Sequence, residues 1–322
     1  MNHKSIFLCL FLLLALTGLP VFAAQEPLRG VWVSTVYNLD YPSKAGLSAQ
    51  ALADEADAII ENAKVWGLNA IFLQVRPSGD ALYASETQPW SALLSGRQGQ
   101  APAESFDPLA YFVEQCHQNG LQLHAWLNPY RLTRTAAATR EEALALLCDS
   151  HPARALEDCL VFYSDGCLYL DPGRPEVRQH LLSVTEEILQ NYDVDGIHLD
   201  DYFYAGPDFA DEATVAAFGG DFLWASDFRR DAVNQLVSAL HTQANEHGKV
   251  FISGIPGIGK SELVKAYAKQ HKADYTNIVH LYYTGSLHED ITRMDFVDDL
   301  PDDTAGARYE RHARFLRTLK EI

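Results

Sequence analysis

Stretches of nearly continuous apolar residues alternate with amphipathic segments along residues 28–250. The apolar stretches are short and rich in β-branched and aromatic residues, which predicts strands at residues 28–36, 69–76, 121–130 and 195–203. The segments between them have helical periodicity and plausible capping residues, which predicts helices at residues 48–66, 106–119, 175–192 and 226–246. Repeated strand–helix units with apolar strands are typical of a parallel sheet in an α/β fold.

The strand within VDGIHLDDYFY (194–204) carries the most informative polar pattern. Side chains alternate between the two faces of a strand, so Ile197 and Leu199 share one face while His198 and Asp200 share the other. Further acidic and aromatic residues follow directly: Asp201, Tyr202 and Tyr204. A (β/α) barrel places its catalytic groups at such carboxyl ends of parallel strands. The alternative is an acidic loop that caps the next helix, although a cap needs one Asp rather than this whole cluster.

The other predicted strands also end in polar or aromatic residues. Arg76 ends the second strand, and the third strand ends in Asn128, Tyr130 and Arg131. Long loops at residues 77–105 and 131–174 follow these strands and would form walls around their ends. This arrangement predicts the mouth of a (β/α)8 TIM-type barrel, of which about five βα units are present.

The N-terminus has the pattern of a cleaved signal peptide. Lys4 precedes an apolar segment at residues 6–16, and a small-x-small pattern ends at Ala23. The apolar segment is too short to span a bilayer stably. We therefore expect residues 1–23 to be removed and the product to be periplasmic or secreted, with no stable membrane span after cleavage.

Charge and cysteine content narrow the possible partners. A formal net charge of −18 argues against nucleic acid and against an anionic membrane surface as partners. Four cysteines lie beyond the signal segment, and we leave open whether they form one local disulfide or stay as free, buried thiols: Cys116, Cys148, Cys159 and Cys167. Their spacing is not a zinc pattern, and we expect neither a metal nor a cofactor in the barrel.

Five sequence blocks resemble, in order, the glycosyl hydrolase-like 10 family. They are RGVWVSTV (29–36), NAIFLQVRPSGDALYASETQPWS (69–91), FDPLAYFVEQCHQNGLQLHAWLNPYR (106–131), YLDPGRPEVR (169–178) and DVDGIHLDDYFY (193–204). The resemblance extends over about residues 28–246. It implies a TIM-type barrel, exported from the cell, that acts on bacterial cell-envelope glycans and on peptidoglycan in particular.

Glycoside cleavage needs two carboxyl groups across the scissile bond. Asp200 is our candidate for the nucleophile or the stabiliser of oxocarbenium charge, with His198 donating to a sugar hydroxyl. Asp201 or Tyr202 would orient the site. A nearby cation lowers the pKa of a carboxylate, so Arg76 would keep Asp200 ionised, unless it belongs to a structural ion pair. The general acid stays open among four candidates: Asp80, Glu86, Asp171 and Asp201.

Further residues are candidates for substrate binding. Asp80, Asn128 and Arg131 offer polar groups at strand ends, whereas His124 fits a buried barrel histidine better than a ligand. Flat faces for sugar rings come from four aromatic residues, with core packing as the alternative for each Trp: Trp90, Trp126, Tyr130 and Tyr204. Arg229 and Arg230 lie on the last predicted helix, where an ion-paired or solvated role is favoured over substrate binding.

After residue 249 the pattern changes to that of a P-loop. VFISGIPGIGKSELVKAYAKQH (250–271) reads as a strand, a G-x-x-x-x-G-K-S loop and a helix, and it resembles the nucleotide-binding module of signal-transducing NTPases with numerous domains. In such a loop, glycines at Gly254, Gly257 and Gly259 let backbone N–H groups cradle phosphates, Lys260 reaches the β/γ phosphates and Ser261 binds Mg²⁺.

These patterns predict three segments. They are a signal peptide (1–23), an incomplete barrel of the glycosidase type (24–249) and a partial P-loop α/β fragment (250–322). The leading hypothesis is an exported glycoside hydrolase whose partner is a cell-wall glycan. The alternatives are an ATP- and Mg²⁺-binding regulator fragment and a non-catalytic glycan-binding protein.

Overall fold

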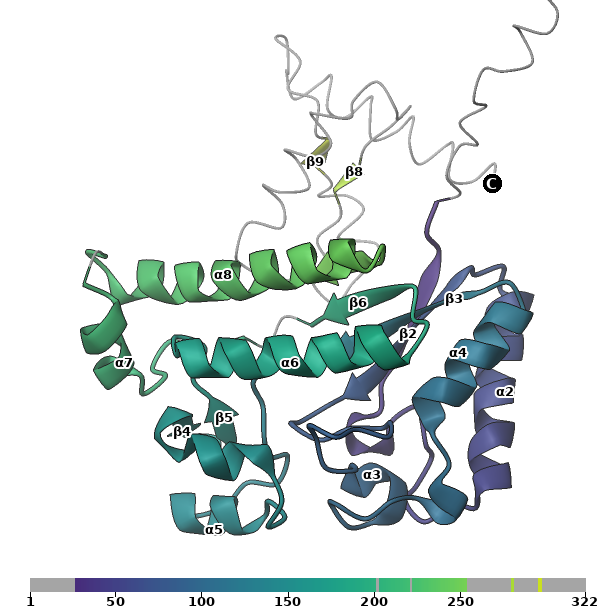
Figure 1. Cartoon of the computed structure of the whole chain (residues 1–322), viewed down its shortest axis with the longest axis horizontal. Coiled ribbons are helices and arrows are strands. Elements are labelled where there is room, and N and C mark those ends of the chain that lie inside the picture. Colours follow the sequence, from purple (N-terminus) through teal and green to yellow (C-terminus); the bar gives the residue numbers. More distant parts are fainter. Residues whose placement is uncertain (1–26, 201–202, 221, 254–278, 281–294, 297–322) are drawn as a thin grey trace, which may run out of the picture.

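The computed structural model describes residues 27–200, 203–220, 222–253, 279–280 and 295–296. Its centre is a five-stranded parallel sheet in the order β1-β2-β3-β6-β7 (Figure 1). The strands are β1 (Gly30–Val33), β2 (Ala70–Arg76), β3 (Gln122–Leu127), β6 (Gly196–Leu199) and β7 (Val250–Ser253). Neighbours in the sheet follow one another along the chain, as in a TIM-type barrel. In the part of the chain that the structure describes, the sheet is an open arc, because β1 and β7 do not pair.

A long helix connects each pair of successive strands. The connecting helices are α2 (Ala49–Val65), α4 (Pro108–Gln118), α6 (Pro175–Asn191) and α8 (Ala225–Glu246). The Ser48 side chain accepts from the N–H of Ala51 and the Asp107 side chain from that of Ala110, so two of these helices begin at side-chain N-caps. In Figure 1, α2 lies beside α4 and α6 beside α8. The predicted strands and helices are thus confirmed to within a few residues.

The long loops contain elements that the periodicity did not predict. After β2 come α3 (Ala92–Ser95) and the 3-10 turn η2 (Ala103–Ser105), and η1 (Val36–Asn38) follows β1. Between β3 and α6 lie α5 (Arg140–Ala145), η3 (Pro152–Cys159) and an antiparallel hairpin. That hairpin consists of β4 (Leu160–Phe162) and β5 (Leu168–Leu170), and α7 (Glu212–Phe218) precedes α8. Two short strands, β8 (Val279–His280) and β9 (Asp295–Phe296), pair with each other.

The two faces of the sheet differ in chemistry. Val33, Leu73, Ala125 and Ile197 are in register across the sheet and belong to the main hydrophobic core. The opposite face carries aromatic and polar residues, with Phe72 stacked on His124 and the ring centroids 4.8 Å apart. Gly196 lies next to His124, where a Cβ atom would come within 2.4 Å of the imidazole and 2.6 Å of the carbonyl oxygen of Val250. This close approach explains the glycine in the strand.

Several expectations concern residues outside the described part. The signal segment (1–23), Asp201, Tyr202 and the P-loop residues Gly254, Gly257, Gly259, Lys260 and Ser261 all lie there. The cysteines Cys116, Cys148, Cys159 and Cys167 are free, so no local disulfide forms among them. Cys159 and Cys167 flank opposite strands of the β4–β5 hairpin, which separates them. Among the described helices, none has the length and apolarity needed to cross a membrane.

Candidate functional site

Asp200 lies directly after β6. Its carboxylate is held by Trp126 of β3 and by Asn128, which directly follows β3. The indole Nε1 of Trp126 donates to Oδ2 at 3.3 Å. The amide Nδ2 of Asn128 donates to both oxygens, at 3.2 and 3.1 Å. Because the donors come from a neighbouring strand, the sheet itself fixes the orientation of the carboxylate. Asp200 remains partly exposed, as a group that acts on substrate must.

His198 lies two residues before Asp200 on the same face of β6, and aromatic rings surround it. The indole Nε1 of Trp32 donates to its Nε2 at 3.0 Å. The rings of Trp32, Phe72 and Trp126 surround the imidazole, with centroids 5.1–6.0 Å away. Since Nε2 accepts this hydrogen bond, a neutral His198 carries its proton on Nδ1. The expected alternation of faces along β6 is confirmed.

Arg76 does not join this site. The pairing of β2 with β3 shifts between Gln74 and Arg76, so Arg76 lies opposite Leu127. Leu127 belongs to the main core, and a shift of one residue exchanges the faces of a strand. The guanidinium donates from Nη1 to the carbonyl oxygens of Asn128 and Pro129, at 2.6 and 3.1 Å. The expected ion pair of Arg76 with Asp200 is therefore absent among the described contacts, and Arg76 supports the end of β3 instead.

Two histidines, the buried His151 and the partly exposed His180, lie near Arg76. Burial lowers the pKa of Arg76 itself to about 10. Burial, together with the charge of Arg76, lowers the pKa of His151 to about 3 and that of His180 to about 4. His151 is 2% exposed, and its Nδ1 accepts from the N–H of Ala153 at the start of η3. His151 is thus a neutral group of the interior, and the partly exposed His180 is neutral at physiological pH as well.

We expect His151→Asn to make stability less dependent on pH. Because the folded-state pKa of His151 lies below the ordinary value, the unfolded chain takes up the proton first, and stability falls as pH decreases from about 6.5 towards about 3. Between pH 7 and pH 5 this costs roughly 2 kcal/mol. Asn retains an acceptor for Ala153. Urea unfolding at both pH values measures the effect, with the exposed His241→Asn as control. If His151→Asn loses as much free energy of unfolding between pH 7 and pH 5 as the unchanged chain does, His151 is not the group responsible.

Other residues expected at the site lie in the core or pack against it. Tyr130 is 1% exposed and packs against Phe203, so its ring face is not open to a sugar. Trp90 packs against the main core. His124 is fully buried and shares a hydrogen bond with Gln122. This agrees with the expectation of a buried barrel histidine rather than a substrate ligand. Burial lowers the pKa of its imidazole.

Arg131 and Tyr204 lie among aromatic residues near the strand ends. The guanidinium of Arg131 lies 5.7 Å from the ring centroid of Tyr169, and its backbone N–H donates to Asn128 Oδ1. Tyr204 packs edge-on against Phe209, and burial raises its phenol pKa. Arg229 covers the ring of Tyr204, 5.5 Å from its centroid. Both residues thus help to build the loop surface beside β6.

The candidates for the general acid differ in setting. Glu86 is exposed on the loop after β2. Asp171 is 3% exposed and accepts hydrogen bonds from Thr214 and the N–H of Gly173, which gives it a structural role at the start of α6. Asp80 is fully buried in a loop pocket, and burial raises its carboxyl pKa although Arg134 opposes the shift. Burial raises the carboxyl pKa of Asp171 as well, so a raised pKa, which suits an acid, does not by itself distinguish Asp80 from Asp171.

Trp32 is the site residue that sequence reasoning missed. It is 61% exposed, and its ring lies next to His198 on the polar face of the sheet. In RGVWV, alternation puts Trp32 on the other face of the strand from Val31 and Val33. This alternation could have placed Trp32 on the polar face of the sheet. Gln74 was missed as well, and its Oε1 accepts from the N–H groups of Thr35 and Val36, which fixes the end of β1.

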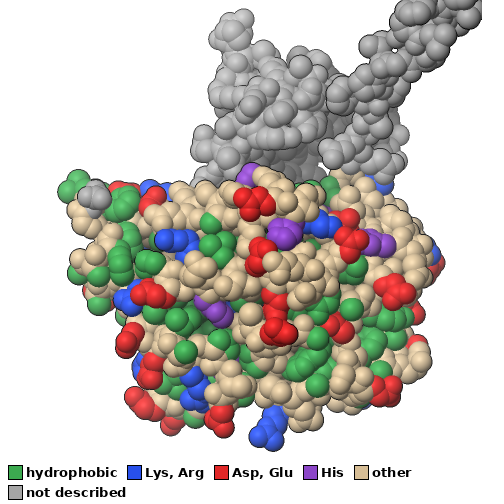
Figure 2. Space-filling model, in the orientation of Figure 1, with side chains coloured by type: hydrophobic (Ala, Val, Ile, Leu, Met, Phe, Trp, Pro, Cys, Tyr) green, Lys and Arg blue, Asp and Glu red, His purple; other side chains and the backbone are tan. Residues whose placement is uncertain are grey.

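Charged side chains are mixed with other types on the face of the molecule shown in Figure 2, where acidic and basic groups are interspersed with neutral and hydrophobic ones. Within the described ranges, no three His, Cys, Asp or Glu side chains are grouped so as to hold a metal ion.

The family model and the curated relatives that match this chain are all described as glycosyl hydrolases or glycosyl hydrolase-like. The family model described as Glycosyl hydrolase-like 10 matches residues 27–250. Glycosyl hydrolase YngK of Bacillus subtilis (strain 168) is 41% identical over 223 residues, which cover 68% of this chain and 42% of that protein. Glycosyl hydrolase DigH of Escherichia coli (strain K12) is 34% identical over 236 residues, with 68% and 52% covered. The chain thus spans about half the length of these curated relatives.

The solved structures that match this chain are more distant in sequence. The chitobiase of Flavobacterium johnsoniae superposes with a TM-score of 0.46 at 11% identity, over 70% of this chain and 31% of that one. Alpha-L-fucosidase isoenzyme 2 from Paenibacillus thiaminolyticus superposes with a TM-score of 0.44 at 14% identity, over 70% and 32%.

Proposed function

The chain belongs to the glycosyl hydrolase-like 10 family, and from this premise we propose that it is a glycoside hydrolase of bacterial cell-envelope glycans. Within that class, peptidoglycan strands are the proposed substrate and the periplasm or the cell exterior the proposed location. The signal-like residues 1–23 support export.

The observation that carries the proposal is the setting of Asp200. A partly exposed carboxylate at the end of a parallel strand is oriented by Trp126 and Asn128. Aromatic rings lie along the same face of the sheet, with Trp32 61% exposed. A carboxylate of this kind attacks the anomeric carbon or stabilises the positive charge that develops there, while the aromatic faces pack against the apolar faces of sugar rings.

The second carboxyl group of the reaction is proposed as Asp201, which follows Asp200 directly in the chain. Asp80 is less suited to this role because its side chain is fully buried. His198 and Arg131 are proposed to bind substrate hydroxyl groups near the strand ends. The chemistry requires no metal or organic cofactor, because two carboxyl groups suffice for it.

The test is incubation of the full chain with purified peptidoglycan glycan strands, followed by mass spectrometry of the soluble products. We expect soluble saccharides with newly formed reducing ends. Binding of the strands without release of saccharides would make the chain a glycan-binding protein instead. If the chain neither binds the strands nor releases saccharides from them, the proposal is overturned.

A further inference from the structure

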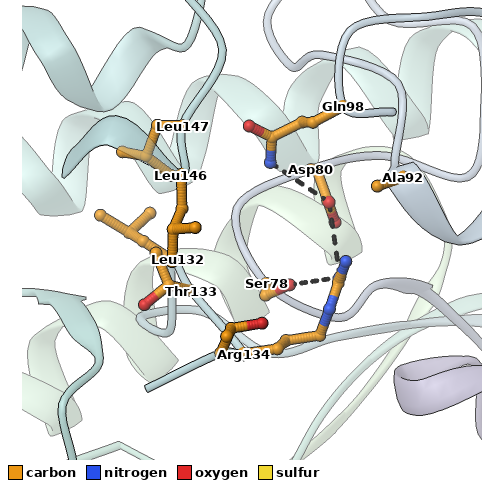
Figure 3. A pocket seen from close by; sticks show the side chains of 10 residues that line it. Ser78, Asp80, Ala92, Gln98, Leu132, Thr133, Arg134, Leu146 and Leu147 are labelled. Carbon is orange, nitrogen blue, oxygen red and sulfur yellow. Dashed lines mark hydrogen bonds and ion pairs between the residues drawn. The ribbon is translucent and has the colours of Figure 1, made fainter. Parts of the chain in front are cut away.

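A pocket of about 160 Å³ lies between the loops that follow β2 and β3 (Figure 3). One side of it is polar, with Asp80, Gln98 and Arg134, and the other is apolar, with Leu146 and Leu147. A water molecule occupies about 30 Å³ in the liquid, so the pocket holds about five of them. That is enough for one substituent of a sugar and too little for a longer ligand.

The polar side contains an acceptor and a donor next to each other. Asp80 is fully buried, and its Oδ2 accepts from Gln98 at 3.3 Å and from Arg134 at 3.4 Å. Its other oxygen, Oδ1, forms no hydrogen bond of good geometry with the described residues, although the nearby Ser91 hydroxyl helps to lower the carboxyl pKa. The Arg134 side chain is 16% exposed, and its Nη1 is also fixed by Ser78 at 2.6 Å. A buried acceptor without a partner is costly, so Oδ1 marks the place of a ligand donor.

The apolar side is open to solvent at one residue. Leu147 is 3% exposed and belongs to the core, whereas Leu146 is 46% exposed although it lines the pocket. Ala92, at the start of α3, lines the pocket as well and leaves room there because its side chain is a single methyl group. A small apolar group in the pocket would therefore be shielded from water.

We propose that this pocket binds the acetamido group of an N-acetylated sugar in the glycan substrate, which rests on the function proposed above. An acetamido group has an N–H for Asp80 Oδ1, a carbonyl oxygen for Arg134 and a methyl group for Leu146. A sugar hydroxyl matches the donor and the acceptor but leaves the leucine side empty. The amide, by contrast, satisfies all three features of the pocket at once.

The pocket and the Asp200 site are both built at the carboxyl ends of neighbouring strands, where a barrel binds its substrate. Asn128, which donates to Asp200, is followed six residues later by Arg134, and Asp80 comes four residues after the end of β2. Tyr37, from the segment after β1, donates to the carbonyl oxygen of Arg134 and ties the pocket to the first strand.

Binding is to be measured by isothermal titration of the full chain carrying Asp200→Asn, so that no bond is cleaved. The probes are the β-1,4 tetramer of N-acetylglucosamine and the β-1,4 tetramer of glucose, which has a hydroxyl in place of the acetamido group. Both probes are neutral, which matters because the chain has a net charge of −18 and would attract an amino sugar nonspecifically. We expect the acetylated tetramer to bind about tenfold tighter or more, the factor that one unpaired buried polar group costs.

Two variants remove the preference for different reasons. In Asp80→Asn the side-chain oxygen stays with Arg134 and Gln98, and the NH₂ group turns a donor towards the N–H of the ligand. Ala92→Leu fills the pocket without changing a polar group, and it serves if the first variant unfolds. Asp149→Asn is the matched control, because Asp149 is exposed and close in sequence to Leu146. We expect the control to retain the full preference.

Equal binding of the two tetramers, or an unchanged preference in both pocket variants, would overturn the inference. So would tight binding of N-acetylalanine amide that Ala92→Leu abolishes, since the pocket would then bind a peptide amide rather than a sugar. Failure of the proposed hydrolase function is distinct, because it would show as absent cleavage by the chain without these changes.

Discussion

Asp200→Asn is expected to remove glycan cleavage by the chain while leaving it folded. The substitution replaces the negative charge by a neutral amide of the same shape, and the transition state of glycoside hydrolysis carries positive charge at the anomeric carbon. Losing the nucleophile or the stabilising charge raises the barrier by roughly 4 kcal/mol or more, which is about a thousandfold in rate. The measurement is the initial rate of saccharide release from purified glycan strands.

The matched control for this change is Asp193→Asn. Asp193 lies just before the same strand at its other end, and its side chain is 75% exposed, paired with Lys249. Surface pairs contribute little, so this variant should keep both its activity and its stability within about 1 kcal/mol. Cleavage by Asp200→Asn at the rate of the unchanged chain would contradict the assignment and move the nucleophile to another carboxylate.

The regular elements of the fold follow from local sequence. The apolar stretches and the helical periodicity predicted the strands of the sheet and the helices between them, because burial on one or both faces imposes those periods. The residues that begin helices are also a local property of the sequence. Asp107 and Pro108 begin α4, and Pro175 begins α6, where the missing N–H of proline costs nothing.

Side-chain position at the strand ends was harder to predict, because it depends on pairing between strands. Alternation placed His198 and Asp200 on one face correctly, and Asn128 does reach Asp200. The same argument failed for Arg76, since a register shift against β3 turned it towards the core. A bulge is not visible in the sequence of one strand, because it is a property of two strands.

The loops carry the features that sequence reasoning could not reach. The pocket around Asp80 needs Arg134 and Leu146 from a different loop, and no local pattern brings these together. Asp80 was nevertheless selected as a candidate, because carboxylates beyond a strand end are typical of barrel sites. The role of Trp32 was overlooked for a related reason, since its partner His198 is 166 residues away along the chain.

The loop after β6 is held by one buried ion pair, and breaking that pair should destabilise the protein strongly. Arg229 of α8 donates to both carboxylate oxygens of Asp211, at 2.9 and 2.5 Å, and to the carbonyl oxygens of Pro207 and Phe209. The side chains of the pair are 19% and 1% exposed. The sequence-based expectation of an ion-paired role for Arg229 is confirmed.

Arg229→Met is expected to lower the free energy of unfolding by about 3–5 kcal/mol, because it leaves the Asp211 carboxylate buried without its counterion. Arg230→Met, on the same helix, is the control, since Arg230 is 53% exposed and forms a surface pair with Asp227 that contributes at most about 1 kcal/mol. Urea unfolding of each variant gives the difference.

The double variant Arg229→Met/Asp211→Leu separates the buried charge from the lost contacts. If the uncompensated carboxylate is the main cost, removing both partners restores much of the stability, since apolar replacements of buried ion pairs are often neutral. The carbonyl oxygens of Pro207 and Phe209 still lose the hydrogen bonds from Arg229 in the double variant, although Phe209 keeps the backbone N–H of Asp211, so recovery should stop short of the original value by about 1 kcal/mol. A double variant no more stable than Arg229→Met alone would show instead that the hydrogen bonds to the loop backbone, rather than the ion pair, hold the loop against α8.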